Sequence, residues 1–501
     1  MKVQRVAIFL LACAVFAGFA AAGELHADVL QCSPSSPQMF KFLGNNIVNL
    51  QEGTVAKFEN WCFEENQVFF EWKSKTEIHV HLESAGKRHL LCTEDLMIST
   101  LLHTKLETKF FSGKTTHVIK LKDESEQHYV RTNGISVIPL CDKLKNIIPD
   151  VIKTVAIFDD QIFSNFPPWF VKKMMNENFE RLEKLTGVQS KKRNLKVPIT
   201  YDWLMNHVKS GDIYCQYSPS GGSTVILFGT GGVCSHVGMF LWEGDHLYFV
   251  ESNPPDIHRY DAQYYFAKIR SDPENELYLL QLSDESRNRF DVDAAWKTYN
   301  NLKGKPYGFD NILFSFWDTP ESSFTQLANT EILFSYVALL NKIPKAKPYV
   351  TQFIEQGLNR RLGTQGLNFN QIVDTLGQRG MKIGDLGAIT ENPNWTYGSD
   401  NGPRYICSAL VAKLLLDGGV FAGFDISPQE FTPNDIYNLN IFKTKGIPAE
   451  CQMNDPYLPY CQLNGNRSLL PFKYYNSIML YSHMNEKCPA LAPLYVRPDK
   501  C

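Results

Sequence analysis

The sequence Tyr405-Ile406-Cys407-Ser408-Ala409-Leu410-Val411-Ala412-Lys413-Leu414-Leu415-Leu416 predicts a helix with a cysteine in its first turn. Apolar side chains recur after Cys407 at i+3, i+4 and i+7, the spacing of one helix face. Pro403 lies just upstream, and Gly418 can end the helix. A thiol at a helix N-terminus has a lowered pKa, and the backbone N–H groups there can stabilise an oxyanion. The alternative is a buried structural cysteine that packs as a small apolar residue.

A nucleophilic thiol needs a base, and His236 is the first candidate. Residues 235–241 predict a strand, Glu243-Gly244-Asp245 a turn, and residues 246–251 a returning strand. With the turn centred between Glu243 and Gly244, His236 and Glu251 become cross-strand partners, so that the carboxylate can orient the imidazole. The alternative is an ordinary surface Glu–His pair. Weaker candidates for the base, without so apolar a strand or a matched acid, are His207, His246 and His258.

The first residues predict a secretory signal peptide over residues 1–22. Lys2 and Arg5 precede an apolar run, and three alanines place the cleavage before Gly23. The apolar run is too short for a membrane anchor, and no later stretch is apolar for long enough to cross a bilayer. We therefore expect a secreted or lysosomal protein without an integral membrane segment.

Composition restricts the class of protein. Of the 501 residues, 44% are hydrophobic and 21% are charged, which excludes a disordered or fibrous chain. The length suits two or three domains. Lys and Arg number 50 and Asp and Glu 53, a net charge of -3, so nothing indicates a nucleic-acid partner.

The cysteines fit an oxidising compartment. Twelve are present, and eleven remain after the leader is removed with Cys13. An odd number leaves one thiol over, and Cys407 stands alone between even clusters, which predicts about five disulfides and a free Cys407. The pairing within the clusters stays open. The clusters are Cys32, Cys62, Cys92 and Cys141; Cys215 and Cys234; and Cys451, Cys461, Cys488 and Cys501. Two glycosylation sequons begin at Asn394 and Asn466.

The sequence from about Asp28 to Cys141 predicts strands. Residues 67–72 and 77–82 have the aromatic and β-branched bias of a sheet, and turn signals recur at short intervals, as in a sandwich or barrel. His79 and His81 would lie on one face of a strand. No third ligand is evident nearby in the sequence, so we expect a half-exposed strand and no metal site.

The middle of the chain mixes helical and irregular patterns. The basic stretch 190–196 predicts a solvated linker, and the glycine-rich stretch 221–232 predicts a mobile loop without a phosphate-binding motif. Helices are predicted over 169–185, 201–208, 291–302, 330–340 and 368–376.

Several blocks in this order resemble the circularly permuted NlpC-like papain fold of the YaeF/YiiX type. The order is His, then acid, then Cys, whereas papain-like chains that are not permuted have the Cys first. The blocks are Gly211-Asp212-Ile213, Ser235-His236-Val237-Gly238, Val250-Glu251-Ser252 and Tyr405 to Val411, with flanking pieces at 304–310 and 431–436. The resemblance covers roughly residues 200–440 and places the cysteine 156 positions after the acid, a gap that an insertion must fill.

The resemblance implies a thiol hydrolase with Cys407 as nucleophile, His236 as base and Glu251 as orienting group. It implies no metal or organic cofactor. The substrate would be an amide or ester of a peptide, a lipid or an N-acyl compound. Tyr405 and Asp212 flank the site and are both candidates for substrate or oxyanion contacts. Tyr405 could line the cleft or help the oxyanion, or else simply pack, and the alternative for Asp212 is that it only shapes the turn before its strand.

The expected fold class is α+β, with a permuted papain-like domain, an N-terminal all-β domain and a disulfide-stapled tail. An inactive secreted binding protein that uses the β-domain is the rival, and an intermolecular disulfide at Cys407 is a weaker one. The oligomeric state stays open. The predicted segments are a signal peptide 1–22, the β-domain 23–148, a helical linker 149–196, the catalytic domain 197–450 with an insertion at about 318–402, and the tail 451–501.

Overall fold

The computed structural model divides the chain into two compact units. The first comprises residues 1–164, 319–321 and 325–390, and the second comprises residues 165–318, 322–324 and 391–501. The residues that the structure describes are 47–58, 62–88, 94–109, 111–140, 169, 173, 176–180, 182–183, 187–219, 221–272, 274–312, 334–335, 337–338, 341, 347–388, 404–470 and 474–481.

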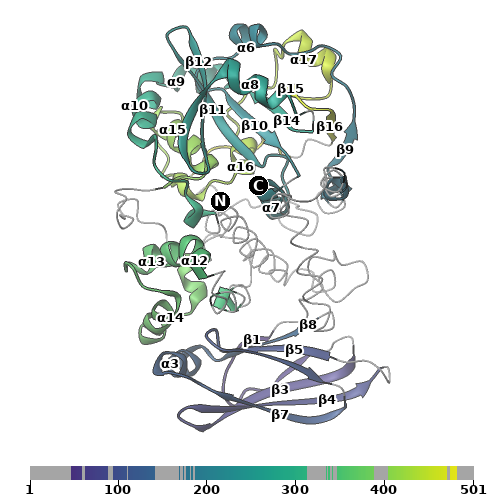
Figure 1. Cartoon of the computed structure of the whole chain (residues 1–501), viewed down its shortest axis with the longest axis vertical. Coiled ribbons are helices and arrows are strands. Elements are labelled where there is room, and N and C mark those ends of the chain that lie inside the picture. Colours follow the sequence, from purple (N-terminus) through teal and green to yellow (C-terminus); the bar gives the residue numbers. More distant parts are fainter. Residues whose placement is uncertain are drawn as a thin grey trace. The chain divides into compact units, whose positions relative to one another are not determined.

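The first unit contains two four-stranded antiparallel sheets (Figure 1). Apolar side chains from both sheets form one core, among them Phe70, Val80 and Ile98. Buried residues alternate with more exposed ones along β3 (Phe63–Ser74) and β4 (Glu77–Lys87), so their sheet has one inner face, whereas Glu94–Ser99 of the other sheet is buried throughout. One sheet has the order β1 (Ile47–Leu50), β8 (Ile135–Leu140), β5 (Glu94–Ser99), β6 (Thr104–Lys109). The other has the order β2 (Ala56–Phe58), β3 (Phe63–Ser74), β4 (Glu77–Lys87), β7 (Gly113–Lys120).

Helices complete this unit, so the prediction of an all-β region is wrong. Helix α3 (Glu124–Asn133) lies between β7 and β8, begins at an Asp123 cap and places Val130 in the core. Residues 325–390, predicted as part of an insertion, belong to this unit, and α14 packs against α3. Within residues 347–388 the structure describes α12 (Lys347–Val350), a π-helix (Thr351–Glu355), α13 (Gln356–Leu362), α14 (Phe369–Gln378) and a 3-10 helix (Ile383–Ala388).

The second unit is built on a six-stranded antiparallel sheet (Figure 1). Helices α6 (Tyr201–His207) and α8 (Ala262–Arg270) share a hydrophobic core with β10, β12 and β14, and α15 (Cys407–Asp417) contacts β11 and β12. The mixed composition with antiparallel sheets confirms the coarse α+β prediction. The strand order is β13 (Asp256–Asp261), β12 (His246–Asn253), β11 (His236–Glu243), β10 (Ile213–Tyr217), β14 (Glu276–Leu280), β15 (Cys461–Asn464). Further helices with bounds in the described part of this unit are α7 (Gly221–Thr230), α9 (Asp284–Arg289), α10 (Val292–Leu302), α16 (Pro433–Asn438) and α17 (Ala449–Asn454), with 3-10 turns at Phe309–Asn311 and Pro428–Glu430.

Helix α7 replaces the loop that we predicted from the glycines at 221–232. Thr224 and Leu227 on this helix are fully buried. A glycine inside a helix costs about 1 kcal/mol relative to alanine. Burial of apolar side chains outweighs that cost here, so composition alone gave the wrong structure.

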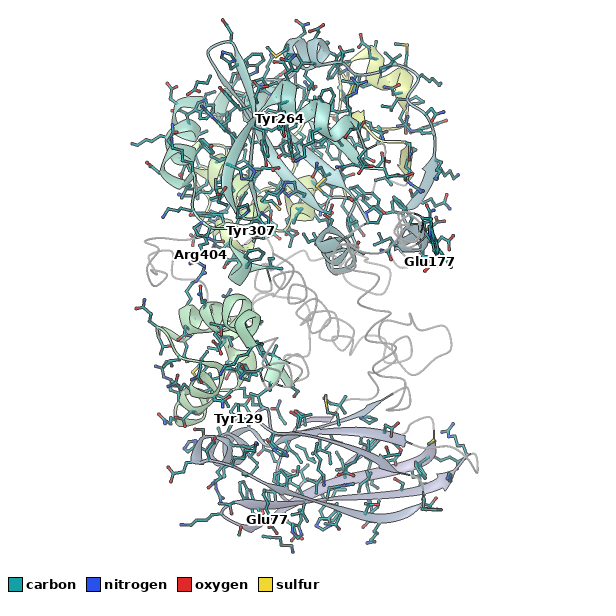
Figure 2. All side chains as sticks on the ribbon, viewed as in Figure 1. Glu77, Tyr129, Glu177, Tyr264, Tyr307 and Arg404 are labelled. Atoms are coloured by element: carbon teal, nitrogen blue, oxygen red, sulfur yellow. A yellow bond between two sulfur atoms is a disulfide. The ribbon has the colours of Figure 1, made fainter. Side chains whose placement is uncertain are left out.

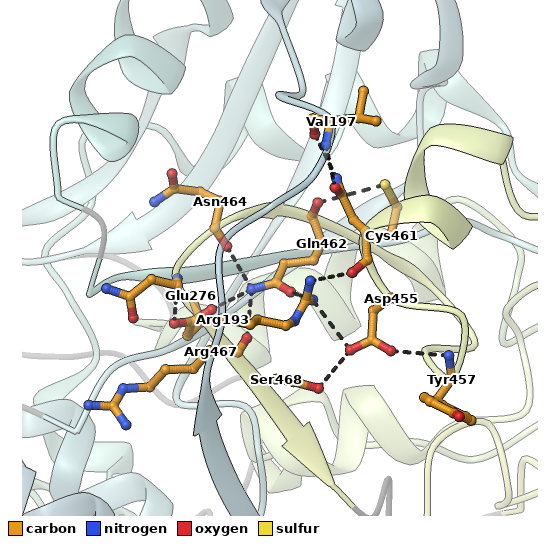
Figure 3. Close-up of polar contacts among 12 residues, drawn as sticks. Arg193, Val197, Glu276, Asp455, Tyr457, Cys461, Gln462, Asn464, Arg467 and Ser468 are labelled. Atoms are coloured by element: carbon orange, nitrogen blue, oxygen red, sulfur yellow. Dashed lines mark hydrogen bonds and ion pairs between the residues drawn. The ribbon is translucent and has the colours of Figure 1, made fainter.

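The basic stretch 190–196 is exposed at residues 191, 192, 194 and 196, as predicted, but it is not simply a linker. Strand β9 (Gln189–Lys192) pairs with β16 (Arg467–Leu470) in a two-stranded antiparallel sheet. Next to it, Arg193 donates hydrogen bonds to the Asn454 carbonyl and to Gln462 and forms an ion pair with Asp455 at 3.3 Å (Figure 3). The positive charge of Arg193 thus meets partners that lie some 260 positions later, which no local pattern reveals.

A buried carboxylate lies beside this contact. The Glu276 side chain is fully buried and accepts hydrogen bonds from the Gln462 amide and from the backbone N–H of Asn466, the latter at 3.1 Å (Figure 3). Burial raises the pKa of Glu276 to about 8, although Arg467 and Arg193 oppose the shift. The Asn466 of the second sequon is therefore half-buried, with its backbone engaged.

Two disulfides lie in the described residues, Cys215–Cys234 and Cys451–Cys461, each within one sequence cluster. Cys62 is also disulfide-bonded, whereas Cys407 is a free, buried thiol. The helices that the structure describes include none that is both long and apolar enough to cross a membrane. The leader, Asn394 and five cysteines (Cys32, Cys92, Cys141, Cys488 and Cys501) lie outside the described residues.

Candidate active site

Helix α15 begins at Cys407, as the sequence predicted. Its N-cap is Ile406, which has no side-chain hydrogen bond to offer, so the first N–H groups of the helix are not capped by a side chain. The backbone N–H of Ser408 hydrogen-bonds the Cys407 sulfur, and the Ser408 hydroxyl donates to the Phe431 carbonyl at 2.6 Å. The cysteine therefore lies where the helix dipole and a backbone donor both favour a thiolate.

The chain segment before α15 is fixed by its backbone. The carbonyl of Tyr405 accepts a hydrogen bond from the Ser252 hydroxyl at 2.7 Å and another from the Gly308 N–H at 3.1 Å. A Cβ at Gly308 would lie 2.8 Å from the Tyr405 carbonyl carbon, so the close approach needs glycine. Tyr405, predicted near the site, thus positions Cys407 through its backbone.

His236 and Glu251 are in contact, with 2.8 Å between Nε2 and Oε2. The register that we assumed is nevertheless wrong. Glu243 pairs with His246, so the turn centres between Gly244 and Asp245, one residue later than predicted. On this register Glu251 lies opposite Gly238, and His236 is its diagonal neighbour. The residue opposite Glu251 thus shifts by two positions, from His236 to Gly238. Because side chains alternate between faces with a period of two, His236 and Glu251 stay on the same face and still meet.

Two tyrosines hold the Glu251 carboxylate from the same side of the sheet. Tyr214 pairs with Gly238 across β10 and β11, and its hydroxyl donates to Oε2 of Glu251. A Cβ at Gly238 would lie 2.3 Å from that hydroxyl oxygen, so the glycine makes room for the phenol. The Tyr265 hydroxyl on α8 lies 3.3 Å from both carboxylate oxygens.

A second imidazole reaches the same carboxylate. His258 Nε2 lies 3.3 Å from Oε1 of Glu251, and His258 Nδ1 lies 3.0 Å from Asp256. Burial disfavours the charge of the fully buried Glu251, but the positive charge of His236 and hydrogen bonds from His236, His258 and Tyr214 outweigh it. The pKa of Glu251 is therefore held well below its usual range. We had ranked His258 as a weak candidate for the base because the sequence gave it neither so apolar a strand nor a matched acid.

The thiol and the imidazole form an ion pair. Burial opposes charge on both, yet hydrogen bonding and charge attraction between Cys407 and His236 outweigh it. The pKa of His236 is raised to about 10, and the pKa of Cys407 is lowered from its ordinary value. The Val237 backbone N–H adds a further hydrogen bond to the sulfur. The ionised form is therefore a thiolate beside an imidazolium, with Glu251 behind it.

Comparison with protein-family models and with curated proteins finds no match for this chain. Any function must therefore be argued from the geometry of Cys407, His236 and Glu251 and from the chemistry of those groups.

Tyr307 belongs to this site and was missed from the sequence. It is buried, its hydroxyl hydrogen-bonds the Cys407 sulfur, and the Cys407 backbone N–H donates to the phenol oxygen; Figure 2 labels it. Burial and the neighbouring thiolate raise the pKa of Tyr307 far above its ordinary value, so the phenol stays protonated. Tyr307 lies in residues 304–310, one of the blocks that carry the resemblance. Neither a charge nor a residue spacing distinguished it there as a site residue.

Asp212 has only structural contacts among the described residues. Its fully buried carboxylate accepts hydrogen bonds from the backbone N–H groups of Lys209 at 2.8 Å and Leu282 at 3.0 Å, and it forms an ion pair with Arg287. Its lone pairs are therefore occupied at the turn before β10. These contacts agree with the alternative that Asp212 shapes the turn before its strand.

Proposed function

We propose that the chain is a thiol hydrolase that cleaves an amide or ester bond. The observation that carries the proposal is the hydrogen-bonded series from Cys407 through His236 to Glu251, with the sulfur at the start of α15. A nucleophile, a base and a third group that orients the base are the parts that covalent acyl transfer requires. The chain order of the three residues supports a permuted papain-like arrangement for residues 197–450, in a secreted or lysosomal protein.

The reaction would begin with attack of the Cys407 thiolate on the carbonyl carbon. The carbonyl oxygen becomes an oxyanion, for which the Tyr307 hydroxyl and the N–H groups at the start of α15 are donors. Imidazolium His236 gives its proton to the leaving amine or alcohol, and an acyl-enzyme remains. Neutral His236 then takes a proton from water, whose oxygen attacks the thioester and releases the acid, which restores the ion pair.

Glu251 does not need to change its charge in this sequence. Its carboxylate stabilises the imidazolium and fixes the ring orientation. The exposed fractions also suit the scheme: His236 is 13% exposed at its side chain, Cys407 is 1% exposed and Glu251 is fully buried. Water is thus largely kept from the thiolate and the carboxylate, which strengthens the charge interactions between them.

The rival proposal is an inactive binding scaffold, which would not need the charged groups of Cys407, His236 and Glu251. Removing a thiolate, an imidazolium and a carboxylate from water costs several kcal/mol for each ion before their mutual attraction repays it. A scaffold reaches equal stability with apolar residues at these positions. The charged series therefore favours catalysis over binding alone.

The test is to trap the acyl-enzyme. Mature, non-reduced protein is mixed with a series of activated aryl esters and aryl amides with short to long acyl chains, and product release is followed while intact mass is measured. We expect a burst of product and an acyl mass on the tryptic peptide that contains Cys407. Cys407→Ser should abolish both, and His236→Ala should remove the burst. His246→Ala, which removes an exposed imidazole from the β11–β12 turn, is the matched control. Absence of any adduct with every ester would overturn the proposal.

A further inference from the structure

Three side chains that can ligate a metal gather on the β2-β3-β4-β7 sheet of the first unit. They are Glu71 on β3 and His79 and His81 on β4, and one ligand atom of each lies within 4.8 Å of the others. We propose that these three residues bind a zinc ion. The sequence showed the His-x-His pair without a third ligand. The structure corrects this, because Glu71 lies directly opposite His79 in the sheet register.

The sheet itself creates the cluster. Successive residues of a strand point to opposite faces, so His79 and His81 share one face while Val80 between them enters the core. Two zinc ligands in tetrahedral coordination lie about 3.3 Å apart, given bonds of about 2 Å. Glu71 Oε1 and His81 Nε2 are 3.0 Å apart, close to that value. The ring nitrogen of His79 can reach the same distance by rotation of its side chain alone, because the hydrogen bonds of the sheet fix both strands.

His81 is already held in place. Its ring stacks on Phe69, with 4.8 Å between ring centroids, and its Nδ1 lies 3.0 Å from the Thr116 hydroxyl on β7. A hydroxyl can accept a hydrogen bond as well as donate one, so Thr116 can take the Nδ1 proton and leave the Nε2 lone pair for a metal. A partner on the other ring nitrogen is the usual support of a metal-binding histidine.

The local charge favours a divalent cation. Glu77, labelled in Figure 2, lies 2.8 Å from His79 Nε2, and the Lys73 ammonium lies 2.6 Å from Glu71 Oε1. Two carboxylates against one ammonium leave a net negative charge beside the imidazoles. The Lys73 side chain is 45% exposed, so it can turn to solvent when an ion takes its place on Glu71.

The donor set selects the metal. Two imidazoles and one carboxylate suit zinc, whereas calcium and magnesium prefer oxygen ligands alone. The histidine side chains are each 22% exposed and Glu71 is 42% exposed. Three protein ligands with solvent access leave a fourth position for water or for a donor from a binding partner.

The experiment measures zinc binding by the full mature chain without an affinity tag. Because Cys407 and His236 could themselves bind zinc, every protein carries Cys407→Ser. Isothermal titration with zinc chloride, supported by metal analysis after dialysis, gives stoichiometry and affinity. The visible absorption of added Co²⁺ reports on the coordination number. The variants are His79→Ala, His81→Ala and the isosteric Glu71→Gln, and the control is His246→Ala in the second unit. Circular dichroism verifies that each variant is folded.

We expect one zinc ion for each chain, with affinity reduced at least tenfold by each of the three cluster variants and unchanged by His246→Ala. Glu71→Gln keeps the shape of the side chain, so it remains decisive if a histidine variant fails to fold. Absence of zinc binding at a hundredfold metal excess would overturn the proposal. Binding that survives in all folded cluster variants would overturn it as well.

Discussion

The phenol of Tyr214 reaches the carboxylate of Glu251 across the Cα atom of Gly238, on the strand that separates them. The contact therefore depends on three neighbouring strands. It needs the side chains of Tyr214 and Glu251, and it needs a residue without a side chain at Gly238. The contact fixes Oε2 of Glu251, the oxygen that also meets His236.

Gly238→Ala should therefore damage both stability and the site. The added methyl group would overlap the Tyr214 ring, and overpacking of this kind costs about 3 kcal/mol in a core that cannot move. Chemical denaturation and thiol alkylation would measure the two effects. Tyr214→Phe is the matched comparison, because it removes only the hydrogen bond and should cost about 1 kcal/mol. Equal stability of Gly238→Ala and the parent protein would refute the close approach.

The ion pair between Cys407 and His236 predicts an alkylation rate that stays high in acid. An ordinary thiol has a pKa of about 8.5, so at pH 5 it is almost fully protonated. Because the pKa of Cys407 is lowered, a larger fraction of it than of free cysteine is thiolate at this pH, so its reaction with iodoacetamide should be faster than that of free cysteine. His236→Ala removes the positive charge and should return the rate at pH 5 to that of free cysteine. A variant rate that matches the parent protein would contradict the ion pair.

The same pair sets the pH range of turnover. The active form needs Cys407 ionised and His236 protonated. Activity should rise with pH through the lowered pKa of Cys407 and fall as pH passes the raised pKa of His236, at about 10. The measurement is kcat/KM for an ester over the whole range. An alkaline limb near pH 6.5, the value of a free imidazole, would show that the pair does not form.

Tyr307→Phe separates transition-state stabilisation from thiol activation. Removal of the hydroxyl takes away an oxyanion donor, an effect of about 100-fold in kcat in other acyl-transfer enzymes. We expect kcat for the ester to fall by about that factor, with KM nearly unchanged. The alkylation rate at pH 5 should fall much less than kcat, because His236 still faces the sulfur although the hydrogen bond from the phenol is lost. Loss of alkylation without a change in kcat would assign Tyr307 to the thiol instead.

Glu276 predicts a contribution to the stability of the fold that is largest in acid. Its folded pKa of about 8 lies above that of an unfolded glutamate, so the folded chain holds the proton more tightly. This contribution to stability is present in full below about pH 4.3 and is lost as pH rises through about 8. We expect the melting temperature to fall by about 5 °C between pH 5 and pH 9. Glu276→Gln should flatten this dependence, whereas Glu285→Gln, at an exposed carboxylate, should not.

Short stretches of sequence predicted the parts of the site that depend only on residues near in sequence. The start of α15 at Cys407 follows from the apolar spacing and the upstream proline, and its end follows from Gly418. The meeting of His236 and Glu251 survived an incorrect register because face alternation has a period of two. The correct turn was also open to prediction, since Gly244 with φ of 57° occupies the first position of a two-residue hairpin loop.

The remaining contacts depend on strand and helix positions that no short window contains. Tyr214, Tyr265 and His258 reach Glu251 from β10, α8 and β13, and Tyr307 comes from a turn far from Cys407 in sequence. Only the order of strands in the sheet brings these groups together. The glycines of α7 mislead for a related reason, because burial against distant segments decides between a helix and a loop.

Strand β15 occupies the last position of the six-stranded sheet, on the free side of β14. A chain shortened to residue 450 would keep every residue of the Cys407 site and lose this cover. The N–H and C=O groups of β14 that now bond to β15 would then be open to pairing with strands of other molecules. Aggregation of such a truncated protein, rather than loss of the catalytic groups, would be its main defect. The C-terminal residues that form β15 thus protect the sheet that carries the site from self-association.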